Sequence, residues 1–175
     1  LRQGQIDMVL LYLKTEERKS FVTYSEQPYL EESYRFYQIE DANLNFNGDL
    51  NTLKNKTIGV VRGYSYGTTF DNYDFQFKYE AGSETQLLEM LLKGRVELII
   101  GNEFVVNYHR NRLKLTNKIK MVNPALDRMP AYFAFSKKAP HGIETAQEFS
   151  TKLQEILDSN KYRQLLKKHN VKTFW

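Results

Sequence analysis

The sequence predicts an α/β layer fold with parallel strands, and two observations lead to that prediction. Short apolar runs alternate with segments of helical periodicity, so that the middle of the chain reads β-α-β-α-β-α-β. Two of these runs are nearly continuous in hydrophobicity, which is typical of strands covered on both faces. The order of the elements therefore indicates helices packed on a mainly parallel sheet.

The first strands are expected where the apolar runs are longest. Residues 6–13 form an almost unbroken apolar run, which predicts a strand inside a parallel sheet. Residues 57–61 form a second such run. Aromatic side chains alternate with other residues over 75–79 and predict a third strand.

A helix is expected between Ser83 and Gly94. Ser83 and Gln86 have the spacing of a capping box, and Gly94 lies where a glycine commonly ends a helix. The predicted apolar face consists of Leu87, Leu88, Met90, Leu91 and Leu92. A strand over 96–100, a helix from about 103 and a short strand near 119–122 complete the alternation.

The two ends of the pattern differ from its middle. Residues 34–55 are polar and rich in Asn, Asp and Gly, which predicts an exposed crossing or loop. Residues 132–135 predict a last strand, followed by two helices. The first helix is expected to open with a capping box at Thr145, and the second to carry Tyr162 and Leu165 on its apolar side.

Composition excludes several classes of protein. Lys and Arg number 25 and Asp and Glu 21, a net charge of +4 that is interspersed rather than gathered on one stripe, so no nucleic-acid partner is expected. No apolar run reaches the ~18 residues of a membrane helix. The absence of cysteine removes disulfides and thiolate metal sites. The sequence opens without a Met or a leader, so we expect a removed leader or a truncated domain.

No motif for metal, cofactor or catalysis is found. His109, His141 and His169 lie far apart and in no metal-ligand spacing. No G-x-S-x-G, Walker or G-x-G-x-x-G pattern follows a strand. We therefore expect no metal, no cofactor and no enzymatic activity.

Two local features leave their chemistry open. The turn 62–67 follows a strand and precedes an expected helix, so it is either an ordinary βα turn or an anion site at a helix N-terminus. Arg18 follows the first strand. It either forks onto a ligand carboxylate or pairs on the surface with Glu16 or Glu17.

Several separated motifs, in order along the whole chain, resemble bacterial solute-binding proteins of family 3, the periplasmic amino-acid receptors of ABC transporters. They are Gly4-Gln5-Ile6-Asp7, Thr15-Glu16-Glu17-Arg18, Tyr24-Ser25-Glu26-Gln27-Pro28-Tyr29, Leu53-Lys54-Asn55-Lys56-Thr57-Ile58-Gly59-Val60, Gly63-Tyr64-Ser65, Gly94-Arg95-Val96-Glu97 and Tyr132-Phe133-Ala134-Phe135-Ser136. The resemblance implies a periplasmic-binding-protein fold of type II, in which two lobes close over a ligand. The first lobe would comprise 1–36 and 136–175, lacking roughly two βα units, and the second 45–131, with hinge crossings at 37–44 and 132–135.

The resemblance also implies site residues in the first lobe. Arg18 matches the family's strand-end arginine, which grips the α-carboxylate of the ligand. The backbone of Leu11 and Leu13 matches the segment that meets the ammonium and the carboxylate.

In the second lobe, Ser65 and its neighbouring backbone match the turn that donates to the same carboxylate. Tyr64 and Tyr66 are expected to line the cleft, and so is Tyr29 of the first lobe. Asn102 departs from the family, because amino-acid binders usually place an Asp there to pair with the α-ammonium. Either Glu103 or a residue outside this sequence takes that role, or the ligand is no standard α-amino acid.

The implied function is non-catalytic binding of a small polar carboxylate-bearing solute in the periplasm, for uptake by an ABC permease of the inner membrane. Two alternatives remain at this stage. A ligand-sensing module of a membrane receptor has the same ligand physics, and a dehydratase-type enzyme on this fold would need Glu103 as its catalytic group.

Overall fold

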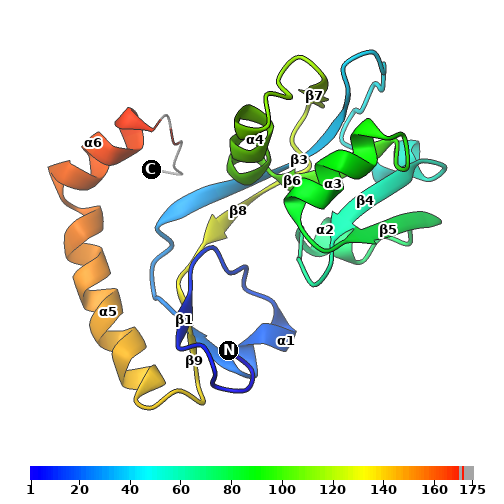
Figure 1. Cartoon of the computed structure of the whole chain (residues 1–175). Coiled ribbons are helices and arrows are strands. Elements are labelled where there is room, and N and C mark those ends of the chain that lie inside the picture. Colours follow the sequence, from blue (N-terminus) through cyan, green and yellow to red (C-terminus); the bar gives the residue numbers. More distant parts are fainter. Residues whose placement is uncertain (170, 172–175) are drawn as a thin grey trace. The chain divides into compact units, whose positions relative to one another are not determined.

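The computed structural model describes residues 1–169 and residue 171, and the chain divides into two units (Figure 1). One unit contains residues 1–31 together with the described residues from Met129 onward, and the other contains Glu32–Arg128. The chain thus passes from the first unit to the second after Glu31 and returns after Arg128. Residue 170 and residues 172–175 of the expected first lobe lie outside the described part.

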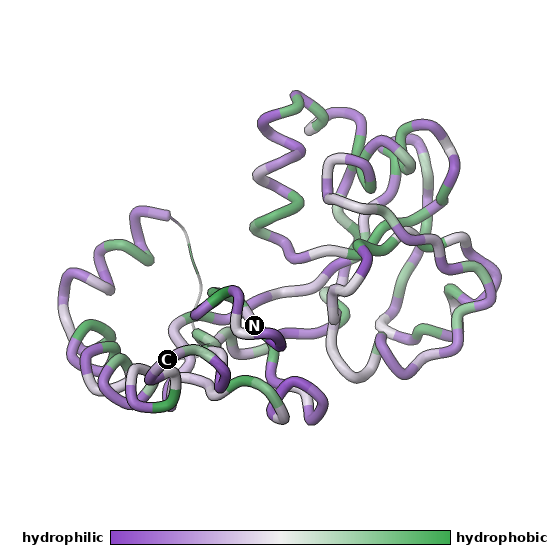
Figure 2. Tube along the Cα trace, turned by 60° about the horizontal axis from the view of Figure 1, so that its bottom comes forward, coloured by the Kyte–Doolittle hydropathy of each residue, from purple (hydrophilic) through white to green (hydrophobic). Residues whose placement is uncertain are grey.

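The described part of the first unit is a small antiparallel sheet with one short helix, α1, and two longer helices, α5 and α6. Its strands have the order β1-β9-β2, and both outer strands run antiparallel to β9. The elements of this unit are β1 (Met8–Val9), α1 (Glu16–Lys19), β2 (Val22–Tyr24), β9 (Ala134–Ser136), α5 (Gly142–Leu157) and α6 (Asn160–Lys168). Helix α5 packs on β9 and β2, where the ring of Phe149 lies 5.3 Å from that of Phe135. Hydrophobic and hydrophilic residues alternate around this helix, as expected for one that covers a sheet (Figure 2).

The second unit is a mixed sheet whose principal strands have the order β5-β4-β6-β3-β7, with β8 paired to β3. Its elements are β3 (Leu30–Ile39, which begins in the first unit), the 3-10 helix η1 (Leu50–Leu53), β4 (Thr57–Val61), α2 (Thr68–Asp71), β5 (Phe77–Ala81), α3 (Glu84–Leu92), β6 (Leu98–Asn102), α4 (Glu103–Arg112), β7 (Ile119–Met121) and β8 (Asp127–Ala131, which ends in the first unit). Strand β4 is parallel to β5 and β6, whereas β3 is antiparallel to β6 and β7.

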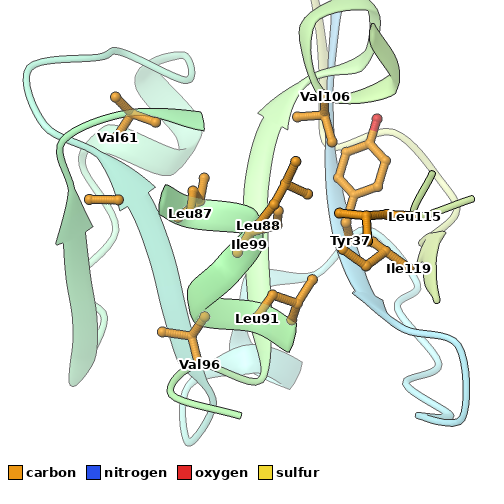
Figure 3. Packing of buried hydrophobic residues seen from close by; sticks show 11 residues of the cluster. Tyr37, Val61, Leu87, Leu88, Leu91, Val96, Ile99, Val106, Leu115 and Ile119 are labelled. Carbon is orange, nitrogen blue, oxygen red and sulfur yellow. The ribbon is translucent and has the colours of Figure 1, made fainter. Parts of the chain in front are cut away.

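The core of the second unit lies between its sheet and helix α3. Leu87, Leu88 and Leu91 of α3 are almost fully buried and pack with Ile99 of β6 and Tyr37 of β3 (Figure 3). Ser83 caps this helix, since its hydroxyl oxygen accepts a hydrogen bond from the backbone N–H of Gln86. The predicted helix at 83–94 and the α/β character of this part of the chain are therefore confirmed.

The strand predicted over residues 6–13 is shorter than expected, and the prediction of a parallel neighbour is wrong. Only Met8 and Val9 form a strand, and its neighbour β9 is antiparallel. Leu11 has φ 53°, in the left-handed region where a side chain is disfavoured, and this turns the chain out of the sheet. Leu10 and Leu11 are exposed rather than covered on both faces.

The expected crossing at 34–55 is wrong over its first residues. Residues 34–39 belong to β3, in which Phe36 and Tyr37 are completely buried. This strand pairs with β6 and β7 in the opposite direction, so the sheet is mixed rather than parallel throughout. The division between the units accordingly falls at Glu31 and Arg128, and differs from the hinge crossings expected at 37–44 and 132–135.

The start of the first closing helix is also corrected. Helix α5 begins at Gly142, after His141 with φ 57°, and Thr145 lies inside its first turn with its N–H bonded to the carbonyl of His141. The helix expected from about 103 and the short strand near 119 are confirmed as α4 and β7.

Two glycines let the helices of the second unit approach its sheet. A Cβ atom on Gly101 would lie 2.3 Å from Cγ2 of Val106, and one on Gly59 would lie 2.7 Å from Cδ1 of Leu87. Both separations are far below van der Waals contact. The distance between α4 and β6 therefore depends on the missing side chain at position 101.

We predict that Gly101→Ala destabilises the protein by about 1–3 kcal/mol, because the added methyl group overpacks a filled core. Urea unfolding measures the change. Val106→Ala removes the clashing methyl group, so in the double variant the cost of Gly101→Ala should fall sharply. A cost for Gly101→Ala that is the same with and without Val106 would show that the contact does not matter.

We also predict that these 175 residues self-associate. Strand β1 is an edge strand, and the neighbouring Ile6, Leu10 and Leu11 have exposed fractions of 53%, 58% and 40%. An apolar patch beside a free strand edge favours pairing with a second chain. Leu10→Lys should reduce the association, which light scattering measures; a monodisperse monomer of the unmodified 175 residues would contradict the prediction.

Candidate functional site

Arg18 is held by uncharged groups in the first unit. Thr15 begins helix α1, and its hydroxyl oxygen accepts a hydrogen bond from the N–H of Arg18. The guanidinium donates from Nη1 to the carbonyl of Leu13 at 3.3 Å and lies 4.0 Å from the centre of the Tyr12 ring. These contacts fix its direction without neutralising it.

The alternative in which Arg18 pairs with a neighbouring glutamate does not occur in the structure. Glu16 pairs with Lys19, and Glu17 pairs with Arg2. No ion pair between residues that the structure describes includes Arg18. No carboxylate of the described residues therefore pairs with its guanidinium, as expected of a group that receives an anion.

Several tyrosines lie near Arg18, and none of them is among the site residues that the sequence predicts. The rings of Tyr12 and Tyr24 are stacked at 6.4 Å, and Tyr132 meets Tyr24 edge-on at 6.1 Å. We call Tyr12, Tyr24 and Tyr132 the tyrosine cluster. Lys14 extends over it, with Nζ 3.5 Å from the centre of the Tyr132 ring. A sequence signal exists, since these tyrosines flank or lie within the motifs of the family, but aromatic residues at strand ends are just as often core.

Burial changes the pKa of two groups beside Arg18, Tyr24 and Lys14. Burial raises the pKa of Tyr24 to about 12, although Arg18 partly opposes the shift, so its hydroxyl stays neutral at physiological pH. Burial, with a smaller effect from Lys19, lowers the pKa of Lys14. The shift works against the charge of Lys14, whereas the positions of Arg18 over the Tyr12 ring and of Lys14 over the Tyr132 ring allow cation–π attraction.

The backbone groups of Leu11 and Leu13 have partners within the protein. The N–H of Leu11 donates to the hydroxyl of Tyr29 at 3.1 Å. The carbonyl of Leu13 accepts from the hydroxyl of Tyr24 at 2.9 Å as well as from Arg18. Their expected contacts with a ligand stay predictions, and the Leu13 carbonyl also serves to position Arg18.

The site residues expected in the second unit gather at one edge of its sheet. Strands β4 and β6 are parallel, so both end there, and the antiparallel β3 begins there with Tyr34 opposite Asn102. Ligands of open α/β sheets bind beyond the carboxyl ends of such strands. The loop 64–67 after β4, Asn102 at the end of β6 and Glu32 on β3 therefore belong to one region.

In the loop after β4, the donors expected to bind a ligand carboxylate are bound to Asp71. The hydroxyl of Ser65 donates to one carboxylate oxygen of Asp71, and the N–H of Tyr66 donates to the other at 3.0 Å. Helix α2 is only four residues long and begins after Gly67 without a side-chain cap. An internal carboxylate thus occupies the donors of this turn.

The two tyrosines of this loop lie in different environments. Tyr64 is 56% exposed, and burial of its remainder together with Glu84 raises its pKa. Tyr66 is buried, its hydroxyl oxygen accepts from the N–H of Val61 at 2.7 Å, and its ring packs edge-on against Tyr34. Tyr66 is therefore a core side chain that supports the sheet edge, and only Tyr64 offers an exposed ring.

Asn102 uses both ends of its amide within the protein. Oδ1 accepts from the N–H groups of Phe104 and Val105, which caps helix α4. Nδ2 donates to Oε1 of Glu32 at 2.7 Å. The residue that departs from the family pattern is thus a structural cap and the anchor of a carboxylate on another strand.

Glu32 is a buried acid that sequence reasoning missed. It is 2% exposed, and its Oε2 accepts from the hydroxyl of Tyr34 at 2.9 Å. Burial raises its pKa to about 7, which the Tyr34 hydrogen bond opposes in part. Glu32, Tyr34 and Phe36 stand at alternate positions, and this strand-like spacing is the sequence signal that could have placed Glu32 on one face with them, but the polar composition of the segment that follows favours a loop.

Glu103, the first residue of helix α4, is already neutralised. Its Oε2 lies 2.6 Å from Nε of Arg35, and Arg35 also donates to Oδ1 of Asn123 at 3.0 Å. An acid held in a part-buried ion pair has little remaining capacity to bind a cation.

Two cavities lie elsewhere in the units. One of about 730 Å³ in the first unit is bordered by Gln27, Pro28 and the elbow between α5 and α6. One of about 460 Å³ in the second unit lies beside Gln38 and Ile39, at the opposite end of β3 from Glu32. None of the sequence-predicted site residues borders either cavity.

The described residues contain no cluster of three or more metal-ligating side chains. Their helices are also too short or too polar for any of them to cross a membrane.

Solved structures with the same fold include an amino-acid-binding protein, a ligand-binding core and a sensor domain. An ancestral arginine-binding protein bound to glutamine has a TM-score of 0.80 and 22% identity, with 96% of this chain and 72% of that chain covered. A histidine kinase sensor domain with similarity to periplasmic binding proteins has a TM-score of 0.79 and 16% identity, covering 96% and 71%. The GluR0 ligand-binding core from Nostoc punctiforme in complex with L-glutamate has a TM-score of 0.74 and 12% identity, covering 94% and 73%.

These similarities define the fold as that of periplasmic binding proteins, a two-unit α/β architecture, of which this chain spans about 70% of the neighbours' length. No family model matches the sequence, and neither does any curated protein.

The buried Glu32 yields a prediction about stability. Its pKa is about 7 in the folded protein, against an ordinary value of 4.5. Because the folded state holds this proton more tightly than the unfolded state, protonation of Glu32 stabilises the fold. This contribution to stability is fully present below pH 4.5 and is lost as the pH rises through 7. The loss is on the order of 3 kcal/mol.

Glu32→Gln should remove this loss, so the variant gains stability relative to wild type between pH 5 and pH 8. Urea unfolding at both pH values measures the difference. Glu89→Gln on the exposed side of α3 is the control and should run parallel to wild type. Parallel curves for Glu32→Gln would show that Glu32 does not titrate as described.

Proposed function

We propose that this protein binds a small polar solute that bears a carboxylate, an amino acid or a related compound, without transforming it. The observation that carries the proposal is the guanidinium of Arg18, which has no ion-pair partner among the described residues and is directed by the Leu13 carbonyl and the Tyr12 ring. A planar guanidinium matches a carboxylate through two parallel hydrogen bonds. The fold supports the proposal, because its neighbours include proteins bound to glutamine and to L-glutamate.

Under this proposal, the other expected site residues contribute in three different ways. In the second unit, Tyr64 offers an exposed ring. In the first unit, Leu11 offers its backbone. Ser65 contributes once a ligand displaces its bond to Asp71. Asn102 holds the side chain of Glu32 through a hydrogen bond and caps helix α4.

The setting we propose is the periplasm, with delivery of the ligand to an ABC permease in the inner membrane. The second candidate is a sensing module that passes ligand occupancy to a membrane receptor. The histidine kinase sensor domain with the same fold favours this alternative. Both candidates require the same binding chemistry, so the first experiment addresses binding itself.

We predict that Arg18→Ala weakens ligand binding at least about a hundredfold, since each charge-assisted hydrogen bond contributes roughly 1.5–3 kcal/mol and two would be lost. Arg18→Lys should weaken it substantially too, because an ammonium cannot form the paired bonds. A thermal-shift screen of amino acids and organic acids on the full-length protein identifies the ligand, and calorimetry measures the variants.

Arg62→Ala, which removes an exposed arginine paired with Glu80, is the matched control and should leave affinity unchanged. If Arg18→Ala binds as tightly as wild type, the assigned anchor is wrong.

A further inference from the structure

The cavity of the second unit is bordered by none of the residues that the proposed function uses. Its volume of about 460 Å³ lies within the ~300–1,000 Å³ that is typical of small-molecule sites. Every residue that borders it belongs to the second unit. These residues are Gln38, Ile39, Ala42, Asn43, Leu44, Asn45, Lys56, Leu91, Gly94, Val96, Glu97 and Leu98.

A buried amide with a free donor borders this cavity. Gln38 is only 4% exposed, and its Oε1 accepts a hydrogen bond from the N–H of Leu44 at 3.0 Å. Because a backbone N–H can only donate, this bond fixes the oxygen toward Leu44 and leaves the NH2 group at the other end of the amide.

Nε2 of Gln38 donates to no group of the described residues in the hydrogen bonds found among them. It is also not one of their enclosed side-chain atoms that lack a partner, so it retains access to the space that Gln38 borders. An amide that is almost wholly buried and keeps a donor open toward a cavity can bind an acceptor there.

The walls of the cavity are apolar and rigid on the side of α3 and β6. Leu91, Val96 and Leu98 are 1%, 2% and 2% exposed. Leu91 and Val96 belong to the core of the second unit (Figure 3). These side chains are held by packing, so they offer a ready apolar surface to the body of a ligand.

The loop on the other side of the cavity is tied to β3 by its backbone. The N–H of Ala42 donates to the carbonyl of Ile39 at 3.1 Å, and the N–H of Leu44 donates to Gln38. A wall that is fixed before binding costs little entropy to order when a ligand enters. The cavity is therefore largely formed in the absence of a ligand.

The two charged residues at the cavity are already satisfied by protein groups. Nζ of Lys56 lies 2.7 Å from Oε1 of Glu97, and Oε2 of Glu97 accepts from the N–H of Thr57 at 3.0 Å. The hydrogen bond from Lys56, followed by that from Thr57, lowers the pKa of Glu97 and keeps it ionised. The cavity thus offers neither a free cation nor a free anion among the residues that border it.

We propose that this cavity binds a small neutral molecule that has an apolar body and one acceptor oxygen, such as a carbonyl, to which Nε2 of Gln38 donates. The apolar body packs against Leu91, Val96 and Leu98. This is a second site, with a ligand of a different class from the carboxylate proposed for Arg18, and it does not depend on that proposal.

The same features exclude two other classes of ligand. A carboxylate would lose water without gaining a counter-ion, since Lys56 is paired with Glu97. A hydrocarbon fits the apolar walls but leaves the amide of Gln38 without an acceptor, which costs binding free energy.

The experiment is a nuclear magnetic resonance titration of the full-length protein with acetophenone, toluene and benzoate. These probes share a benzene ring and carry a neutral carbonyl, no acceptor oxygen and a carboxylate, respectively. The backbone N–H of Leu44 and the side-chain amide of Gln38 report on the cavity. Acetophenone should shift both signals and bind more tightly there than benzoate.

Gln38→Glu tests the role of the amide, because it keeps an oxygen for the N–H of Leu44 and replaces the NH2 group. At pH 8 it should weaken acetophenone binding roughly fivefold or more, since one hydrogen bond is lost. Toluene binding should change less. Gln86→Glu is the matched control, because Gln86 also accepts from a loop N–H, that of Gly82, but lies outside the cavity. It should bind all three probes as wild type does.

Ala42→Phe supplies a second variant, which decides the matter if Gln38→Glu does not fold. A phenyl ring at this position of the loop should fill the cavity and abolish the binding of acetophenone and toluene alike. Binding that persists in Ala42→Phe would place the probes elsewhere and overturn the proposal.

Three further results would also overturn it. Acetophenone could leave the signals of Leu44 and Gln38 unmoved in the wild type. Gln38→Glu could bind acetophenone as tightly as the wild type does. Benzoate could bind at these signals more tightly than acetophenone, which would show that the cavity takes an anion. None of these results bears on Arg18, so the proposed function stands or fails separately.

Discussion

The antiparallel register of β3 on β6 is the constraint on which the second unit depends. It places Tyr34 opposite Asn102 and so brings Glu32 to the edge where β4 and β6 end. A shift by one residue would turn every side chain of β3 to the other face of the sheet. Phe36 would then leave the core and Glu32 would lose Asn102, so the packing of the unit and the chemistry of its edge are fixed together.

The two units each hold an ionisable side chain by uncharged groups, a cation in the first unit and an acid in the second. In the first unit, Arg18 and Lys14 lie on tyrosine rings, which attract a cation without providing a counter-ion. In the second unit, Glu32 is held by two neutral donors. Each arrangement orients an ionisable group within its own unit without an ion-pair partner among the residues that the structure describes.

Asn102, at the position where the resemblance leads us to expect an Asp, has a structural role that a comparison of sequences does not reveal. An Asp at this position could still cap α4, but it would place a second carboxylate beside Glu32. Like charges at such a distance raise the cost of ionisation. The neutral amide caps the helix and donates to the acid at once, so Asn at 102 and Glu at 32 form a matched pair from two strands.

The sequence by itself determined the local elements whose signals lie within a few residues, such as the capped helix α3 and the strand β4. It also indicated the fold through motifs spread along the chain, and it singled out Arg18. Only the tertiary structure decided the direction of β3, the short β1 and the partners of Asn102. Strand pairing joins residues about 70 positions apart, and a buried acid differs from an exposed one only through neighbours that the chain brings from elsewhere.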